Sequence, residues 1–403
     1  MGSEDSVTSE TPQSARLGGG GTAAAVQGAP RMTHTAYPAL APRRRRWPLL
    51  LIVAIVAGLA AAWTALWFYA TARAKTEIAA WREREYQAGR FYDCASESIG
   101  GYPFRIEWRC AGAVLELKGT PPVELKLPVI LAAVQIYDPT LVIGEFTGPL
   151  DISEPGRPPN YVANWSLGQA SVRGTPDSLE RTSLVLDVPT VRDPRRAGND
   201  TVFRAQRLEL HGRLAPGSTA DNPAIDTVLR VNAGVAPYIH AATTKPIDAD
   251  IAAVLRGLSD VSPKPWPVRF KEWQERGGQI DIIKARLQQE DVIAVGSGTV
   301  KLTPGGNLDG NLQVAVVGLE QVLKIFEIDR MLSEGQIGST LGALDRLIPG
   351  LGDIARQNAP GLIAAIGQRT VLEGKPAVAF LLRFIDGVVF LGPIQVGRAP
   401  PLF

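Results

Sequence analysis

The stretch GSGTVKLTPGGNLDGNLQVAVVGL, residues 296–319, decides the fold class. Apolar side chains occupy every second position around Val300–Leu302 and again along Leu312–Val316, with Pro304-Gly305-Gly306-Asn307 between the two runs. This alternation is typical of an antiparallel strand with one face on a core and the other in water. Proline and glycine between such runs indicate a turn. The segment therefore predicts two antiparallel strands joined by a hairpin turn.

The same pattern recurs elsewhere in the chain. Leucine alternates with charged residues along Leu208–Leu214, and Asp386-Gly387 is a hairpin signal between the apolar runs Phe380–Phe384 and Val388–Leu391. The chain also contains 41 glycines and 31 prolines, which favour many turns and short strands over long helices.

Three segments with helical spacing interrupt the strands. They are Asp248–Leu258, the residues Leu319, Val322, Leu323 and Phe326, and Leu362–Ile366. We therefore predict a β-rich α+β fold, in which an amino-terminal transmembrane helix is followed by antiparallel meandering or curled sheets with several packed helices.

The predicted transmembrane helix is the run from Trp47 to Ala70, which contains no charged residue. As a helix it would reach roughly 36 Å, enough to cross a hydrocarbon core of about 30 Å. The alternative is a cleaved signal peptide, because Ala70-Thr71-Ala72 resembles a cleavage site. The length of the run argues against cleavage. Aromatic residues suited to the membrane interfaces also favour a retained anchor, and they are Trp47, Trp63, Trp67, Phe68 and Tyr69.

The orientation of this anchor is predicted from the basic residues that flank it. A dense block, Arg43, Arg44, Arg45 and Arg46, precedes the run, whereas basic and acidic residues are mixed after it. Lys and Arg close to a span favour the cytoplasmic side. We expect a cytoplasmic amino terminus, with the rest of the chain exported.

Composition divides the chain into predicted segments. We expect a disordered cytoplasmic tail, a transmembrane anchor, a helical stalk that stops near Gly89, and two β-rich sub-domains, the second with amphipathic helices; their ranges are 1–42, 43–72, 73–92, 93–245 and 246–403. The prolines between 236 and 267 suggest the last boundary, although they also fit a long connection within one domain.

Cys94 and Cys110 are the only cysteines in the sequence. In an oxidising compartment they form a candidate disulfide. A bridge over a loop of this size would stabilise the fold by about 3 kcal/mol, in a structural role. Two buried free thiols are the alternative. A redox or metal site would need a CxxC spacing or nearby histidines, which the sequence lacks.

The sequence contains no strong signal of catalysis. Its 42 basic and 40 acidic residues nearly balance, so nucleic acid is not an expected partner. His34, His211 and His240 are far apart in the sequence and are interpreted as solvated. The sequence contains no GxSxG motif, and PGGNLDG fits a hairpin turn better than a phosphate cradle. We expect no enzymatic activity, no catalytic or metal-binding residues and no cofactor.

Four segments carry a family resemblance: GGYPFRIEWRC, WQERGGQIDI, the opening stretch and the closing DGVVFLGPIQVGRAPPL. Together they resemble an uncharacterised bacterial family known as domain of unknown function 2125, over roughly Ala74–Phe403. The resemblance implies a single amino-terminal span, hence a bacterial inner-membrane protein with a periplasmic domain, and it brings no catalytic residues. The layout is also similar, by architecture alone, to AsmA-like envelope proteins, which are thought to handle lipids.

The terminal hairpin, FLLRFIDGVVFLGPI, is apolar on both faces. Each face must therefore be covered by protein, membrane or ligand. An ordinary buried core is one interpretation. The functional hypothesis is a sheet curled round an apolar groove that binds or transfers lipid or envelope material. The alternative function is a structural adaptor that organises partner proteins at the cell envelope.

Overall fold

The computed structural model describes residues 46–175, 178–196, 200–219, 221–325, 367–392 and 394–403. By its internal contacts the chain divides into two compact units, residues 1–56 and 57–403. The predicted disordered tail, Arg43 to Arg45, His34 and the predicted helix at 362–366 all lie outside the described residues.

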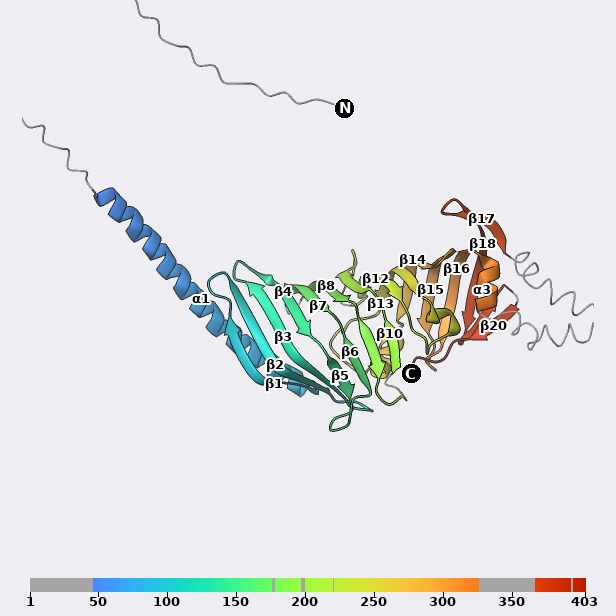
Figure 1. The fold of residues 1–403 in the computed structure, drawn as a ribbon, viewed down its shortest axis with the longest axis horizontal. Coiled ribbons are helices and arrows are strands. Elements are labelled where there is room, and N and C mark those ends of the chain that lie inside the picture. The colour runs from blue at the N-terminus through green and yellow to red at the C-terminus, as the bar shows by residue number, and fades with distance from the viewer. Residues whose placement is uncertain (1–45, 176–177, 197–199, 220, 326–366, 393) are drawn as a thin grey trace, which may run out of the picture. The chain divides into compact units, whose positions relative to one another are not determined.

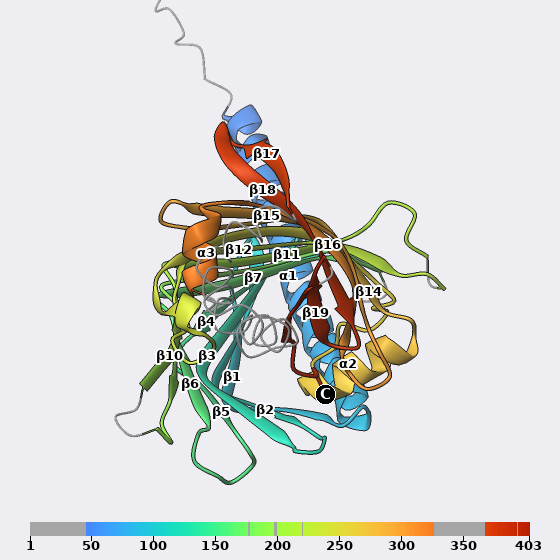
Figure 2. The ribbon, with the colours of Figure 1, turned by 90° about the vertical axis from the view of Figure 1, so that its right-hand side faces the viewer.

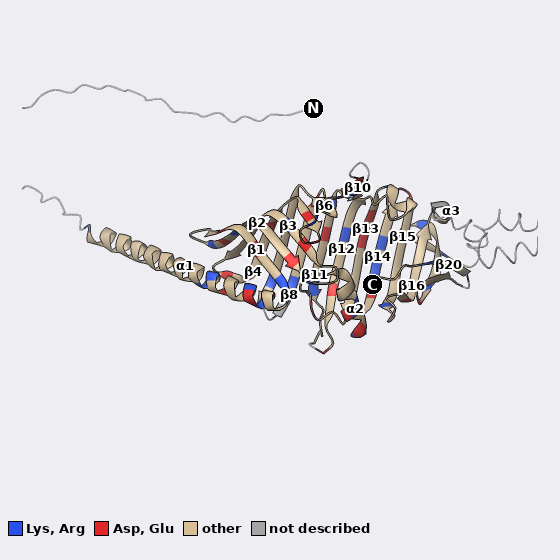
Figure 3. Cartoon of the chain, turned by 90° about the horizontal axis from the view of Figure 1, so that it is seen from below, with Lys and Arg blue, Asp and Glu red and all other residues tan. Residues whose placement is uncertain are grey.

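The first element is the 41-residue helix α1, Trp47–Gln87. Its mean hydropathy reaches 2.5, and it is long and apolar enough to span a membrane. Figure 3 shows that charged residues lie along its carboxyl-terminal part, beyond the uncharged run. The helix ends where Gly89 adopts a φ of +78°, as predicted for a glycine stop.

Among the described residues, twenty strands form one sheet, and their pairings are antiparallel; Figure 1 shows the arrangement. The strands are β1 Arg90–Gly100, β2 Arg105–Leu117, β3 Val123–Gln135, β4 Asp138–Thr147, β5 Leu150–Ser153, β6 Tyr161–Asn164, β7 Leu167–Thr175, β8 Ser178–Asp187, β9 Thr190–Asp193, β10 Asp200–Arg204, β11 Arg207–Leu214, β12 Ala224–Gly234, β13 Ile247–Arg256, β14 Gln279–Gln289, β15 Val292–Leu302, β16 Leu308–Val317, β17 Gln368–Leu372, β18 Lys375–Ile385, β19 Val388–Leu391 and β20 Ile394–Arg398.

The strand order is nearly sequential. The main ladder runs β1-β2-β3-β4-β7-β8-β11-β12-β13-β14-β15-β16-β18-β19-β20, and β17 pairs with β18 beside it. A branch, β5-β6-β9-β10, leaves from the amino-terminal half of β3. Figure 2 shows that the sheet is curled rather than flat. The predicted β-rich fold with a long amino-terminal helix is therefore confirmed.

The predicted strands and turns of the opening stretch are present as β15, β16 and their connection. The Asp386-Gly387 turn joins β18 to β19, and both residues have the positive φ that such a turn requires. Asp386 also accepts hydrogen bonds from Thr303 and Asn307. Hydrogen bonds therefore connect the two predicted turns.

The predicted helix at Asp248–Leu258 is wrong, because this segment forms β13. Its alanines and leucines suit a helix, but Ile247, Ile251 and Leu255 are four residues apart, an even spacing that also places them on one face of a strand. Hydrogen bonding to β12 on one side and β14 on the other satisfies the backbone of the segment. Tertiary pairing thus overrides helix propensity. The same pairing makes β12 and β13, on either side of the predicted boundary at 245/246, hydrogen-bonded neighbours.

Four helical elements occur among the described residues. Besides α1 they are the 3-10 turn η1, Ala241–Thr244, and the helices α2, Trp266–Glu275, and α3, Leu319–Ile325. The predicted helix at Leu319–Phe326 is thus confirmed as far as Ile325, because Phe326 lies outside the described residues.

Cys94 and Cys110 form a disulfide with a Cα–Cα distance of 5.4 Å. It joins the neighbouring strands β1 and β2. The sequence placed Cys94 at the end of the stalk, but β1 already begins at Arg90, so the bridge staples the first hairpin of the sheet instead.

The carboxyl-terminal part of α1 packs on this hairpin through a set of contacts that we call the stalk junction. Arg90 donates to Glu85 at 2.8 Å, and both side chains are only 14 % exposed. Arg82 donates to Glu97 at 2.7 Å. The ring of Trp81 lies 4.6 Å from that of Tyr92, whose pKa burial raises to about 12. Paired charges and aromatic rings in contact therefore cover the first strands.

Candidate functional site: an apolar cleft

A cleft of about 740 Å³ lies in the carboxyl-terminal half of the sheet. Seven strands, from β13 to β16 and from β18 to β20, and the helix α3 supply its apolar lining, and residues around η1 and after β20 complete it. The apolar side chains of this lining are Ala242, Ile247, Leu287, Val292, Ala294, Val314, Val316, Leu319, Val322, Leu323, Phe380, Leu382, Val389, Leu391, Val396 and Ala399. Polar groups are few: the other lining residues, apart from Gly397, are His240, Gln288, Gln289 and Arg398.

Strand register brings this lining together. Val314 pairs with Phe380 on the neighbouring strand β18, and Ala294 pairs with Val316. Paired residues point to the same face of a sheet, and every second residue along each strand joins them. The alternation visible in the sequence thus becomes a continuous apolar surface across β14, β15, β16 and β18.

Helix α3 closes one side of the cleft. It follows Gly318, whose carbonyl accepts the first helical hydrogen bonds from Gln321 and Val322. Leu323, 1 % exposed, packs against Phe380 and Leu391. Part of the terminal hairpin is therefore ordinary core, as one interpretation of the sequence predicted. The remaining lining borders the cleft.

The 3-10 turn η1 forms another wall, and polar contacts hold it in place. Gln289 donates to the carbonyls of Ala242, at 2.9 Å, and Lys245, at 3.2 Å. His240 Nδ1 accepts from the Ala242 amide at 3.0 Å, so His240 caps this turn. His240 is exposed, as its interpretation as a solvated residue predicted.

The face of these strands opposite the cleft is buried in one part and exposed in another. Beneath β15 and β16, Ile293, Val317 and Ala377 form a second buried cluster. Farther along β18, Leu381 is 50 % exposed and Ile385 51 % exposed. The two faces of the terminal hairpin are thus unequal, since one borders α3 and the cleft while the other leaves apolar side chains open.

His211 belongs to a polar row outside this cleft. Its Nδ1 lies 3.0 Å from Ser183 Oγ, and its Nε2 lies 3.3 Å from Glu209 Oε2. The serine contact is not visible in the sequence, because Ser183 lies on β8 and meets His211 through strand pairing. Arg207 and Arg230 also contact Glu209, and hydrogen bonds from Arg207 and His211 lower the pKa of that carboxyl. Glu209 is thus shared by three partners in one charge network.

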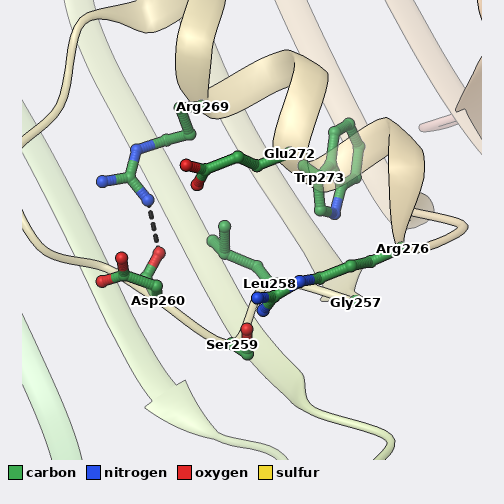
Figure 4. A pocket seen from close by; sticks show the side chains of 8 residues that line it. All are labelled: Gly257, Leu258, Ser259, Asp260, Arg269, Glu272, Trp273 and Arg276. Atoms are coloured by element: carbon green, nitrogen blue, oxygen red, sulfur yellow. Dashed lines mark hydrogen bonds between the residues drawn. The ribbon is translucent and has the colours of Figure 1, made fainter.

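A smaller hollow, shown in Figure 4, lies between α2 and the end of β13. Its volume of about 10 Å³ has room for about one water molecule. Trp273 donates from its indole to the Arg256 carbonyl at 2.6 Å, and Arg269 donates to the Asp260 carbonyl. Burial opposes ionisation of Asp260, but hydrogen bonds from Lys264 and Ser262 hold its pKa well below the ordinary value. This hollow is therefore a helix–sheet joint.

No group of three or more His, Cys, Asp or Glu side chains is placed to hold a metal ion among the described residues. The cysteines instead form a disulfide, and carboxylates form ion pairs in the stalk junction and in the α2 joint, where they hold elements of the fold together. The cleft is thus the feature best suited to receive a ligand, because sites for small molecules are concave and mostly apolar.

The fold and the cleft together define a class: a β-rich protein with one amino-terminal helix able to span a membrane and an apolar cleft in a large curled sheet. The chain belongs to the family described as "Uncharacterized protein conserved in bacteria (DUF2125)", whose model matches residues 67–400. No curated protein matches the chain. The match begins in the last apolar turns of α1 and covers the whole sheet.

Proposed function

We propose that this protein is anchored in the bacterial inner membrane by α1, with its amino terminus in the cytoplasm and its sheet in the periplasm. There it binds or transfers lipid acyl chains, or similar apolar envelope material, without catalysing a reaction. The observation that carries the proposal is the cleft of about 740 Å³ with its almost wholly apolar lining.

The size and chemistry of the cleft support an acyl ligand. Small-molecule sites commonly span about 300–1,000 Å³ and use few polar groups. Each methylene removed from water contributes about 0.8 kcal/mol, whereas association costs roughly 4–15 kcal/mol. A chain burying roughly ten methylenes would gain about 8 kcal/mol, which is comparable with this cost. Binding of such a chain would therefore be weak and reversible, which suits transfer. The charged side chain of the lining, Arg398, could pair with an anionic headgroup.

The disulfide supports the periplasmic placement. Cys94 and Cys110 are joined in the structure, and such bonds persist in oxidising compartments such as the bacterial periplasm. The positive-inside preference of the block that ends at Arg46 supports the same orientation.

Mass spectrometry of extracted lipid tests this function. Residues 76–403, which lack the apolar run, would be exported to the periplasm and purified without detergent. We expect stoichiometric lipid in the native sequence and its loss in Val314→Trp, which fills the cleft. The matched control is Leu381→Trp, which places the same side chain on the other face of β18, where Leu381 is half exposed.

Equal lipid content in both variants would place the lipid elsewhere on the protein. A folded native fragment without lipid would overturn the binding function and favour the adaptor function. In that case, cross-linking of the full chain to envelope proteins is the next experiment.

A further inference from the structure

The turn between β1 and β2 lies against the apolar part of α1. Trp63 donates from its indole to the Pro103 carbonyl at 2.8 Å, and Trp67 donates to the Arg105 carbonyl at 2.9 Å. Thr64 and Tyr102 share a hydrogen bond of 2.9 Å between their hydroxyls. The turn is thereby fixed to three residues within about one turn of the helix.

We propose that this turn, Tyr102-Pro103-Phe104, is a second membrane contact, immersed in the lipid interface beside the helix. The proposal goes beyond the cleft function. It rests on the anchoring role of α1 and is independent of what the cleft binds.

The depth of the turn follows from the length of the helix. At about 1.5 Å per residue, Trp63 lies roughly 24 Å and Trp67 roughly 30 Å along the axis from Trp47. A hydrocarbon core is about 30 Å thick. If the apolar run spans this core, both tryptophans lie near its far boundary. A turn hydrogen-bonded to them therefore lies at the same level.

The exposed side chains of the turn suit that environment. Tyr102 is 55 % exposed and Phe104 is 62 % exposed. The next turn, between β3 and β4, presents Tyr137 at 69 % exposure, and the Ile136 amide donates to the Phe104 carbonyl at 3.2 Å. Large aromatic side chains are costly in water but are favoured where a bilayer meets water. The two neighbouring turns thus form one aromatic edge.

The backbone of the turn is also prepared for a medium poor in water. A peptide carbonyl without a partner costs several kcal/mol in lipid. The indole of Trp63 donates to the Pro103 carbonyl, and that of Trp67 donates to the carbonyl of Arg105, the residue after the turn. The Ile136 amide donates to the Phe104 carbonyl, and the Arg105 amide donates to the Gly101 carbonyl. Indole donors are unnecessary for a turn in bulk water, because water would bond these carbonyls.

The nearby charges limit how deep the turn can go. Arg105 pairs with Glu107 at 2.6 Å, and the Arg105 side chain is 61 % exposed. An arginine beside the interface can extend its charged head toward lipid phosphates while its stem covers apolar surface. The turn is therefore placed at the headgroup boundary and not in the centre of the bilayer.

Depth-dependent quenching tests the proposal in the full-length chain. Variants with one added cysteine, Phe104→Cys or Tyr137→Cys, would carry an environment-sensitive dye on that cysteine. The native cysteines are bonded to each other and will not react. Vesicles of phosphatidylethanolamine and phosphatidylglycerol would contain nitroxide lipids with the quencher near the headgroup or near the chain end. Leu59→Cys in α1 is the positive control, and Asp291→Cys in the exposed β14–β15 turn is the negative control.

We expect headgroup-level nitroxides to reduce the fluorescence at both aromatic turns, chain-end nitroxides to reduce it at Leu59, and neither to affect Asp291. The proposal would be overturned if lipid nitroxides reduce the fluorescence at Leu59 but the fluorescence at both turns responds only to iodide in the water. That result would leave the anchor intact. Fluorescence at Leu59 that no lipid nitroxide reduces would overturn the anchor, and the membrane contact with it.

Discussion

The stalk junction and the apolar cleft cover apolar strands in different ways. At the stalk junction, the chain's own helix covers the first hairpin with paired charges and aromatic rings in contact. At the cleft, α3 covers the terminal hairpin only in part, at Phe380 and Leu391, and the remaining lining borders about 740 Å³ of space. The first region uses its specific contacts for attachment, whereas the second leaves apolar surface available.

The difference shows why polar contacts alone are a poor guide to function in this protein. Its charged pairs, such as Glu85 with Arg90 and Asp187 with Arg207, join elements of the fold. The candidate binding surface is lined mostly by apolar side chains, and its few polar contacts hold η1 in place. Measurements on the two regions should therefore differ in kind: substitutions at the stalk junction should affect stability, whereas substitutions in the open part of the cleft should affect ligand content.

The largest effect is expected at Leu323, where the cleft is closed. Leu323→Ala removes a side chain that is 1 % exposed and packs on two strands. Burial of this kind predicts a loss of about 3–5 kcal/mol in the free energy of unfolding, measured by urea denaturation. Leu381→Ala, on the open face, should cost far less. Similar losses for both would show that α3 does not close the cleft.

A smaller effect is expected from the disulfide at the other end of the sheet. Replacing both Cys94 and Cys110 with serine removes a cross-link between residues 16 apart in the sequence. Loop entropy predicts a loss of about 3 kcal/mol, seen as a lower denaturation midpoint. Lipid content should stay unchanged, since the cleft is built from other strands. A loss of lipid without a loss of stability would contradict the independence of the two regions.

The smallest effect is expected at Glu85 in the stalk junction. The hydrogen bond from Arg90 lowers the pKa of Glu85 below its ordinary value. Because the folded-state pKa is the lower one, the stabilisation is full at neutral pH and is lost as the pH falls below about 4. Glu85→Gln should cost about 1–2 kcal/mol at neutral pH and less in acid. Glu83→Gln, at an exposed position on the same helix, is the control. A Glu85→Gln cost that does not change with pH would contradict the pairing.

Local patterns made much of the fold predictable. The alternation around Val300–Leu302 and the Asp386-Gly387 turn are signals that adjacent residues carry, and both were interpreted correctly. The helix predicted at Asp248–Leu258 is wrong because its residues fit both the helical and the strand period. Only the pairing with β12 and β14 decides for a strand.

The sites depend on contacts between distant residues, which the sequence does not display. The apolar hairpin suggested a groove, but its walls from β14 and η1 could not be assigned to it. Trp63 and Pro103 are 40 residues apart, and Ser183 and His211 are 28 apart. Strand register alone brings the second pair together, whereas the first pair meets because the hairpin folds back along α1.

The most direct test of acyl binding is photocross-linking in living bacteria with a photoreactive amino acid at one of two adjacent positions. Leu382 borders the cleft, whereas Leu381 is half exposed on the opposite face of the same strand. The account predicts lipid adducts on the full-length protein from position 382 and none from position 381. Equal adducts from both positions, or protein adducts alone from position 382, would contradict it.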